Sequence, residues 1–290
     1  MKILITGAAG MLGADLCNEL KKSHAVIGLD VKKPPVEDSL VIDIANKKSL
    51  YEAIISKRPD MVAHCAAYTD VDGCELNKDK AYQINALGTK NVAEACKDID
   101  CAMAYISTDF IFDGKKQAPY TEEDRPWPIS VYGRTKLEGE EFVKALLKKY
   151  LIIRTSWTYG KSGKNFVESI LASAKSGLAL SVVSDQVGSP TYTIDLAQAI
   201  KKLIEKACVG SLYGVYHVTN SGSCSRHEEA LKILELAGIK DVKIKPISSQ
   251  EANYPAKRPK MSVLDNSKYG KLFGDRLRPW EDALKDYLKK

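Results

Sequence analysis

Short apolar segments alternate with longer amphipathic segments through the first half of the chain. Six apolar segments predict strands: Ile3–Thr6, Ala25–Asp30, Leu40–Ile42, Met61–Cys65, Ala102–Ser107 and Leu151–Ser156. The segments between them have helical length, so the alternation predicts a parallel sheet. Hydrophobicity within these strands is continuous and not two-periodic, so we expect helices to bury both faces. The pattern therefore predicts an α/β fold with a doubly wound, Rossmann-like sheet.

The pattern changes after Ser156. Turn-rich stretches at Trp157–Gly163, Ser184–Pro190 and Ser221–Cys224 separate helical segments at Thr193–Ala207 and Ser225–Ala237. We interpret this region as a smaller C-terminal substrate-binding lobe. Because Gly214–Val218 is strand-like, we expect it and the helix before it to return to the main sheet. The predicted dinucleotide-binding domain comprises residues 1–156 joined by 192–219, and the predicted lobe comprises residues 157–191 and 220–290.

The composition is that of an ordinary globular protein. Of the 290 residues, 44% are hydrophobic and 28% are charged, which excludes disordered, collagen-like and fibrous classes. The net charge of +6 comes from lysine pairs such as Lys21 and Lys22, which are typical of solvated helix faces. No zinc-finger, basic leucine zipper or RNA-recognition motif accompanies this charge, so we expect no nucleic-acid partner. A basic surface suits an anionic small substrate.

Cysteine usage and the N-terminal segment indicate the cellular compartment. The seven cysteines are odd in number and lack the spacing of a disulfide framework, and Cys65, Cys96 and Cys101 lie in apolar contexts where reduced thiols are expected. The apolar run Ile3–Thr6 is too short for a signal peptide, and no segment approaches the roughly 18 apolar residues of a membrane span. We therefore expect a cytoplasmic protein with no membrane partner.

A glycine-rich loop follows the first predicted strand and precedes a helical segment that runs to about Lys22. Its glycines stand in the pattern G-x-x-G-x-x-G, in the strand, turn and helix context that a dinucleotide pyrophosphate needs. Gly7 allows the turn, Gly10 allows the phosphates to approach, and Gly13 allows helix and strand to pack closely. A simple turn is the alternative interpretation. The residues expected to contact the cofactor are Gly7, Gly10, Met11, Leu12 and Gly13.

Asp30 ends the second predicted strand, about twenty residues downstream, where a carboxylate accepts hydrogen bonds from the adenosine ribose. Its charge disfavours a 2′-phosphate, so the sequence favours NADH. Lys32 and Lys33 follow at once and would neutralise such a phosphate, so NADPH stays open as the cofactor.

Tyr132 and Lys136 are four residues apart at the start of a helical segment, so their side chains share one helix face. With 14 tyrosines in a lysine-rich chain, about two such pairs arise by chance. The position of the pair carries the inference, because it follows a strand that leads into Ser107 and Thr108. In the alternative interpretation, Tyr132 packs on the sheet and Lys136 is a surface residue.

The chemistry of ketone reduction explains these residue types. Hydride transfer from the cofactor places negative charge on the carbonyl oxygen, and a phenol with a pKa near 10 is a poor acid at neutral pH. We expect the Lys136 ammonium to lower the pKa of Tyr132 and to hold the nicotinamide ribose. The hydroxyl of Thr108, with Ser107 as the less favoured candidate, is expected to orient the carbonyl oxygen.

Four blocks that span most of the chain carry a family resemblance: Ser107–Gly114, Tyr132–Gly139, Arg154–Tyr159 and Asp185–Thr191. Together they resemble the dTDP-4-dehydrorhamnose reductase family, within the extended short-chain dehydrogenase/reductase superfamily. The resemblance implies reduction of the 4-keto group of dTDP-6-deoxy-L-lyxo-4-hexulose to give dTDP-L-rhamnose. It also implies that Thr108, Tyr132 and Lys136 are the catalytic set.

The resemblance implies further cofactor and substrate contacts. On the cofactor side these are Asp43 and Ile44 at the adenine, and Ala66, Ala67 and Tyr68 in a loop beside the nicotinamide. On the substrate side they are Asp109 and Trp157 at the sugar, Lys164, Asn165 and Phe166 in a substrate segment, and Arg258 at the diphosphate.

The residues taken alone leave alternatives open for several of these contacts. Asp43 also fits a carboxylate at a helix N-terminus, Asp109 a turn cap, Trp157 a core residue and Arg258 a surface salt bridge. Lys115 and Lys116 depart from the family pattern, and Asn253–Trp280 matches it only loosely, so the resemblance specifies the chemistry more closely than the nucleotide. We find no cluster at metal-ligand spacing and expect no metal. A homodimer is one option for the assembly.

Two competing functions share much of this pattern. A sugar-nucleotide dehydratase or epimerase would use the same loop, Asp30, Tyr132 and Lys136, but a dehydratase resembles Thr-Asp-Glu where this chain has Asp109 followed by Phe110. A non-catalytic regulatory subunit that resembles the methionine adenosyltransferase β subunit has a similar fold and similar blocks. Such a binder would not need the intact set of Thr108, Tyr132 and Lys136.

Overall fold

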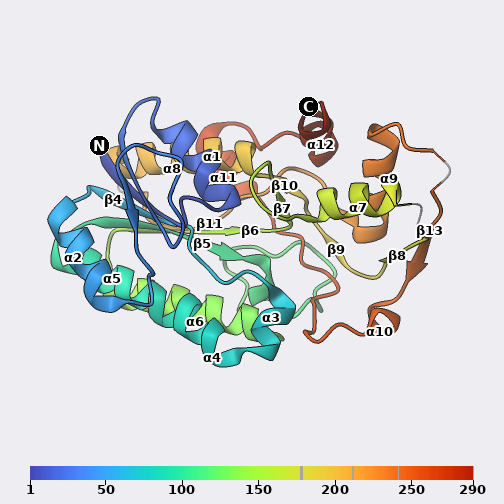
Figure 1. The fold of residues 1–290 in the computed structure, drawn as a ribbon, viewed down its shortest axis with the longest axis horizontal. Coiled ribbons are helices and arrows are strands. Elements are labelled where there is room, and N and C mark those ends of the chain that lie inside the picture. Colours follow the sequence, from blue (N-terminus) through green and yellow to red (C-terminus); the bar gives the residue numbers. More distant parts are fainter. Residues whose placement is uncertain (177–178, 211, 241, 290) are drawn as a thin grey trace.

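A parallel sheet of seven strands lies at the centre of the molecule, between helices on both faces (Figure 1). The structure is a computed structural model that describes all residues except 177–178, 211, 241 and 290. The strand order across the sheet is β11, β6, β5, β4, β1, β2, β3. In chain order the strands are β1 (Lys2–Thr6), β2 (Ala25–Asp30), β3 (Ser39–Val41), β4 (Met61–His64), β5 (Ala102–Thr108), β6 (Tyr150–Thr155) and β11 (Gly214–His217). All six predicted strands are present within one residue of their predicted bounds, and the doubly wound α/β fold is confirmed.

Helices cover both faces of the sheet (Figure 1). One face carries α1 (Met11–Leu20), α8 (Thr193–Gly210) and α11 (Ser267–Phe273), and the other carries α2 (Lys47–Lys57), α5 (Thr89–Asp98) and α6 (Val131–Leu146). Alternate residues of β1 serve the two sides, because Ile3 and Ile5 pack with the first group of helices and Leu4 packs with the second. Both strand faces are therefore buried, which explains the continuous hydrophobicity of the strands.

The segment after β4 is irregular before it reaches α5. It contains α3 (Val71–Leu76), α4 (Lys78–Ala81) and a π-helical turn at Tyr82–Gly88. Within this turn, the buried Asn85 amide accepts a hydrogen bond from Tyr68 N at 2.8 Å and donates one to Tyr68 O at 3.0 Å. The side chain of Asn85 thus fixes the loop that follows β4, and π-helical turns often occur near functional sites.

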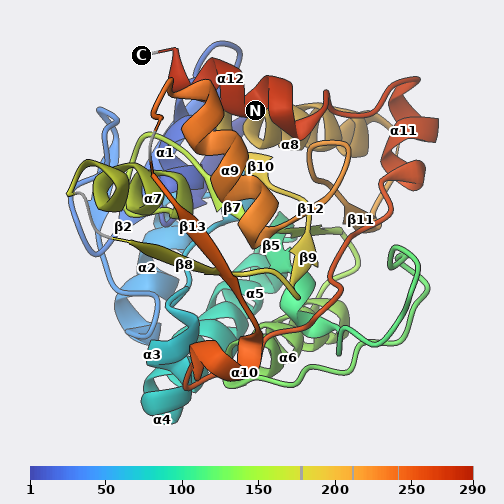
Figure 2. The same cartoon turned by 90° about the vertical axis from the view of Figure 1, so that its right-hand side faces the viewer.

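A smaller lobe stands beside the carboxyl ends of the central strands, and Figure 2 shows it facing the viewer, with α9, β8 and β13 at its centre. It packs around its own apolar cluster, which includes Val167, Ile233 and Leu284. Its main elements are α7 (Phe166–Lys175), β8 (Leu180–Val183), α9 (Arg226–Leu236), β13 (Ile244–Ile247), α10 (Ser249–Ala252) and α12 (Trp280–Leu288). Short two-residue strands complete it: β7 (Thr158–Tyr159), β9 (Val187–Gly188), β10 (Thr191–Tyr192) and β12 (Cys224–Ser225).

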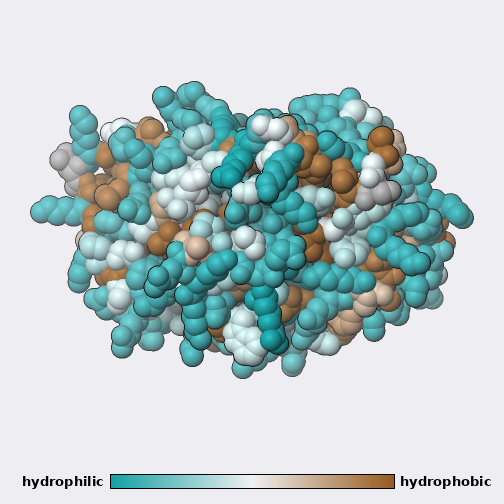
Figure 3. Space-filling view, turned by 180° about the vertical axis from the view of Figure 1, so that it is seen from behind, coloured by the Kyte–Doolittle hydropathy of each residue, from teal (hydrophilic) through white to brown (hydrophobic). Residues whose placement is uncertain are grey.

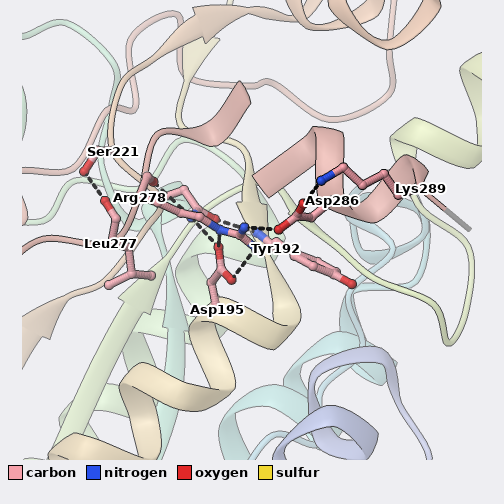
Figure 4. A network of polar contacts seen from close by, with 8 residues as sticks. Tyr192, Asp195, Ser221, Leu277, Arg278, Asp286 and Lys289 are labelled. Atoms are coloured by element: carbon pink, nitrogen blue, oxygen red, sulfur yellow. Dashed lines mark hydrogen bonds and ion pairs between the residues drawn. The ribbon is translucent and has the colours of Figure 1, made fainter. Parts of the chain in front are cut away.

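Arg278 ties the C-terminal helix α12 to α8 (Figure 4). Its guanidinium donates to both carboxylate oxygens of Asp195, in the first turn of α8, at 2.8 and 2.9 Å. It also pairs with Asp286 on α12, and Lys289 donates to the same carboxylate at 2.8 Å. The hydrogen bond to Asp195 raises the pKa of Arg278. This network therefore joins an element of the lobe to a helix that covers the main sheet.

The surface is largely hydrophilic on the side opposite to Figure 1, where apolar residues form small, separate patches (Figure 3). Among the described residues, no helix is both long enough and apolar enough to cross a membrane.

Candidate active site

A cavity of about 700 Å³ opens at the carboxyl edge of the sheet, between the sheet and the lobe. Residues at or just after the ends of β1, β2, β4, β5 and β6 line it, which is where ligands bind in open α/β sheets. The predicted site residues that it brings together are Gly7, Gly10, Met11, Leu12, Gly13, Asp30, Asp43, Ile44, Ala66, Ala67, Thr108, Asp109, Tyr132, Lys136, Trp157 and Arg258.

The glycine-rich loop forms one end of the cavity. Gly7 has a φ of 69°, in the left-handed region that favours glycine. A Cβ atom at Gly13 would lie 2.0 Å from Gly7 O, so α1 packs directly on the loop. Gly10 precedes α1 and provides no side-chain cap, which leaves the first N–H groups of the helix available to an anion. These residues fit the pyrophosphate of a dinucleotide.

Asp30 lies on the rim next to this loop. One carboxylate oxygen accepts from Ala9 N at 3.0 Å, and the other accepts from Lys32 N at 3.1 Å. Each oxygen keeps a further lone pair that could accept from a ribose hydroxyl. Lys32 also lines the cavity, so a cation stands beside the carboxylate. The carboxylate geometry thus suits hydrogen bonds from a ribose, and Lys32 lines the same cavity.

Close backbone packing brings Tyr132 to the end of β5. Ser130 caps α6 by accepting from Gly133 N at 3.2 Å, which places Tyr132 in the first helical turn. A Cβ atom at Gly133 would lie 2.1 Å from Phe110 O, so only glycine lets α6 approach the turn after β5 this closely. The Phe110 and Tyr132 rings pack edge to face, with their centroids 5.7 Å apart. Thr108, Tyr132 and Lys136 consequently line the same cavity.

The buried ammonium of Lys136 is held from two sides. Its Nζ donates to Ile106 O at 2.6 Å and lies 4.1 Å from the centroid of the Tyr105 ring. Burial lowers the pKa of Lys136 to about 7, against the opposing effect of Glu140. The ammonium is thus poised between its charged and neutral forms near neutral pH.

The pKa of Tyr132 differs from our expectation. We expected the Lys136 ammonium to lower it, but burial raises it above 10, and a hydrogen bond with Thr108 opposes this rise only in part. Asp109 and Cys74 raise it further. The expectation was wrong because desolvation of the phenolate outweighs the stabilisation from its neighbours.

Asp109 is 1% exposed and has an unusual environment for a carboxylate. Its Oδ1 accepts from the Thr108 hydroxyl at 3.1 Å, whereas its Oδ2 has no hydrogen-bond partner among the described residues. Burial raises the pKa of Asp109 to about 6, and the nearby Ser262, Thr108 and Arg226 moderate this rise. A buried acceptor without a partner beside a cavity is a candidate ligand contact.

Four predicted site residues do not line the cavity: Tyr68, Lys164, Asn165 and Phe166. Asn165 caps α7 by accepting from Glu168 N at 3.0 Å and donates to Gly160 O at 2.9 Å, and Lys164 precedes it outside the lining. Tyr68 also lies outside the lining, where its backbone bonds to Asn85.

Arg258 and Asp43 line the cavity but already have partners. Arg258 forms a forked ion pair with Asp72, at 3.0 and 2.8 Å, and its guanidinium lies 4.1 Å from the Tyr254 ring centroid. The salt-bridge alternative therefore describes its contacts in this structure. Asp43 accepts from Ala45 N at 2.9 Å near the start of α2, as a carboxylate before a helix does. A ligand in the cavity would therefore share Arg258 and Asp43 with the protein groups that they already bind.

Sequence reasoning missed Arg226, which also lines the cavity and whose guanidinium lies 3.6 Å from the Trp157 ring centroid. The available signal was the capping box formed by Ser225 and Glu228, which marks the start of a helix but no contact. Within the described chain, no group of three or more histidine, cysteine, aspartate or glutamate side chains could hold a metal ion.

Comparison with known proteins shows the family of this chain. Residues 1–290 match the RmlD substrate binding domain. The chain belongs to this family. One relative, the spore coat polysaccharide biosynthesis protein SpsK of Bacillus subtilis (strain 168), is 41% identical over 289 residues, which cover 99% of this chain and 97% of SpsK.

Two solved structures resemble this RmlD family member along nearly its whole length. A dTDP-4-dehydrorhamnose reductase from Clostridium acetobutylicum ATCC 824 is 45% identical, with a TM-score of 0.91 over 99% of this chain and 98% of that one. A dTDP-4-dehydrorhamnose reductase from Bacillus anthracis strain Ames, in complex with NADP, is 42% identical, with a TM-score of 0.90 over 99% and 98%. The predicted family is confirmed, and so is the prediction of a nicotinamide-dependent oxidoreductase.

Proposed function

We propose that this protein reduces the 4-keto group of a nucleotide-linked deoxy sugar, with Tyr132 as the proton donor. The observation that carries the proposal is the meeting of Thr108, Tyr132 and Lys136 in one cavity that also contains the glycine-rich loop. The names of the similar structures favour dTDP-4-dehydrorhamnose as the substrate and dTDP-L-rhamnose as the product.

The side chains have distinct tasks in this reaction. The reduced nicotinamide supplies the hydride. The Thr108 and Tyr132 hydroxyls would hold the carbonyl oxygen, and Tyr132 would transfer its proton to that oxygen as negative charge develops there. A raised pKa keeps Tyr132 protonated at neutral pH, so the proton is available before the reaction. The Lys136 ammonium would bind the ribose hydroxyls and stabilise the phenolate that remains.

For the cofactor, we propose NADH as the preferred form, because the Asp30 carboxylate on the rim disfavours a 2′-phosphate. Lys32 lies beside it and allows NADPH as a second cofactor. Rates measured with NADH and NADPH under identical conditions test this preference. A Lys32→Met variant should lose rate with NADPH and keep its rate with NADH.

The competing functions predict other side chains at the cavity. A dehydratase needs a second carboxyl group after Asp109, but Phe110 occupies that place and packs its ring on Tyr132. A regulatory binder has no use for a buried ammonium one helical turn from a half-buried phenol. We therefore favour the reductase.

A single assay tests the proposed function. Loss of NADH or NADPH absorbance is followed with a panel of nucleotide-linked 4-keto sugars, for the natural protein and for Tyr132→Phe. General acid catalysis is typically worth about 100-fold to 10,000-fold, so we expect kcat of Tyr132→Phe to fall at least about 100-fold. Tyr82→Phe, at a tyrosine that is 39% exposed on the surface, is the matched control and should retain its rate.

Two results would reject parts of this proposal. Turnover by Tyr132→Phe within a few-fold of the natural protein would exclude Tyr132 as the proton donor. Oxidation of neither cofactor with any 4-keto sugar would exclude the reductase and favour the regulatory binder.

A further inference from the structure

Arg226 projects from the lobe into the wall of the cavity. It is the first residue of α9, and its backbone N donates to Gln186 O at 3.2 Å. Its guanidinium lies 3.6 Å from the ring centroid of Trp157 and 4.7 Å from that of Phe166. Stacking on aromatic faces is a favourable arrangement for the planar guanidinium group. The aromatic rings of Trp157 and Phe166 thus hold the Arg226 guanidinium in position.

A buried carboxylate fixes the same guanidinium from another direction. Arg226 Nη1 donates to Glu229 Oε2 at 2.8 Å, and the Glu229 side chain is 1% exposed. In the described part of the chain, the other guanidinium N–H groups of Arg226 donate to no protein atom. The side chain is 21% exposed and lines the cavity, so a ligand could accept from these groups. Arg226 therefore combines a fixed position with unused hydrogen-bond donors.

Trp157, which carries this stack, adopts a backbone conformation that is rare for its residue type. Its φ is 46°, in the left-handed region, where bulky side chains are strained. A Cβ atom at Gly188 would lie 2.4 Å from Cε2 of the indole, so the ring packs directly on the Gly188 backbone. The Trp157 ring is thus confined between Gly188 and Arg226. Such strain persists only where the surroundings hold it, as at ligand sites.

Arg226 and Asp109 line the same cavity and carry complementary hydrogen-bonding groups. Asp109 directly follows Thr108, and its Oδ2 has no partner among the described residues. The charge of Arg226 acts on Asp109, because it is one of the groups that lower the pKa of this carboxyl. Unused donors and an unused acceptor therefore line the same cavity, close to the hydroxyl proposed to hold the substrate carbonyl.

We propose that Arg226 determines substrate specificity: together with Asp109, it binds a sugar hydroxyl on the carbon next to the ketone, with the Trp157 ring as the adjoining surface. This inference rests on the proposed reductase function. A hydroxyl group can accept from Arg226 and donate to Asp109 at the same time. A sugar that lacks this hydroxyl would leave the buried Asp109 Oδ2 and the remaining donors of Arg226 unsatisfied, so the site should reject it.

The test compares two keto sugars that differ only in this hydroxyl. The kcat/KM ratio for the hydroxylated sugar over its deoxy analogue is measured for the natural protein, Arg226→Lys and the double variant Arg226→Met/Glu229→Met. The double variant avoids leaving the Glu229 carboxylate buried without a partner. We expect the ratio to fall at least about tenfold in the double variant, with an intermediate value for Arg226→Lys, which keeps the charge but loses the fork.

Two controls separate specificity from a structural effect. The KM for the nicotinamide cofactor should stay unchanged in every variant, because the glycine-rich loop is intact. Lys232→Met, in the same helix, should keep the natural ratio, since Lys232 pairs with the exposed Glu235 and does not line the cavity. Thermal unfolding confirms that each variant is folded.

The outcomes of this test are distinct. An unchanged ratio in the folded double variant, or equal losses with both sugars, would overturn the inference and leave Arg226 as a structural partner of Glu229. Absence of any keto-sugar reduction by the natural protein would instead refute the proposed function, so the two failures can be told apart.

Discussion

Glu140 and Arg154 form a forked ion pair that is sealed from solvent behind the carboxyl ends of β5 and β6. The guanidinium donates to the two carboxylate oxygens at 2.9 and 2.8 Å, and both side chains are at most 2% exposed. The Ser107 hydroxyl donates to the same carboxylate at 2.6 Å. Since Ser107 precedes Thr108 and Glu140 lies one turn beyond Lys136, this pair connects the two elements that carry the proposed catalytic residues.

Replacing Glu140 by Gln should destabilise the protein strongly. Breaking a buried pair from one side leaves an unpaired charge on Arg154 and costs about 3 to 5 kcal/mol. Chemical denaturation of the natural protein and of Glu140→Gln measures this difference in unfolding free energy. Glu141→Gln, at the exposed neighbouring position, is the matched control and should change it by less than about 0.5 kcal/mol.

The effect of Glu140 should also depend on pH. Burial raises its pKa, but Arg154 and Ser107 outweigh burial, so the pKa in the folded protein lies below the ordinary 4.5. The pair therefore stabilises the fold fully above pH 4.5, and this stabilisation is lost as the pH falls through the lower folded value. The free-energy difference between natural protein and Glu140→Gln should shrink in acid, and a difference that grew there would contradict this account.

Tyr105 should control the ionisation of Lys136. The ammonium lies on the face of the Tyr105 ring, and the Tyr105 hydroxyl donates to Lys136 O at 3.1 Å. A desolvated cation–π contact is worth about 2 kcal/mol, so Tyr105→Leu should lower the Lys136 pKa from about 7 by about one pH unit or more. Tyr105→Phe keeps the ring and should retain a value close to 7.

The pH dependence of kcat/KM measures this shift. The charged form of Lys136 exists below its pKa, so activity should be lost as the pH rises through that value. The alkaline limb should move to lower pH in Tyr105→Leu and stay near its natural position in Tyr105→Phe. Identical limbs in the natural protein and in Tyr105→Leu would show that the ring does not support the ammonium.

Gly13→Ala should disrupt the glycine-rich loop. The added Cβ would lie 2.0 Å from Gly7 O, and neither backbone can move without separating α1 from the loop. We expect cofactor affinity, measured by titration calorimetry, to fall at least about tenfold, because the helix N-terminus would no longer face the pyrophosphate. Gly210→Ala, whose nearest neighbour is a flexible side chain at 3.8 Å, is the control and should bind normally.

The sequence predicted the strands well because the sheet is buried on both faces, and this leaves continuous apolar runs such as Ile3–Thr6. It also identified the glycine-rich loop and the Tyr132–Lys136 pair, whose spacing is local. Contacts that depend on tertiary packing could not be predicted from the sequence. Arg226 depends on Trp157 and Glu229 for its position, and the pKa of Tyr132 depends on a degree of burial that no spacing reveals.

Helix capping also gives some predicted site residues structural contacts that the sequence did not reveal. Asn165 resembles a substrate contact in sequence, but in the structure its side chain accepts from Glu168 N and begins α7. Arg258 lines the cavity as expected, yet its forked ion pair joins Asp72, which lies far away in the sequence.

The position of β11 at the edge of the sheet has a consequence for synthesis on the ribosome. Until residues 214–217 emerge, β6 is itself an edge strand, with its apolar residues Leu151, Ile152 and Ile153 and an unpaired backbone. Open apolar edges pair readily with other chains. A nascent or truncated chain that ends before Gly214 should therefore aggregate, and β6 gains its second neighbour only once residues 214–217, about three quarters of the way along the chain, have been made.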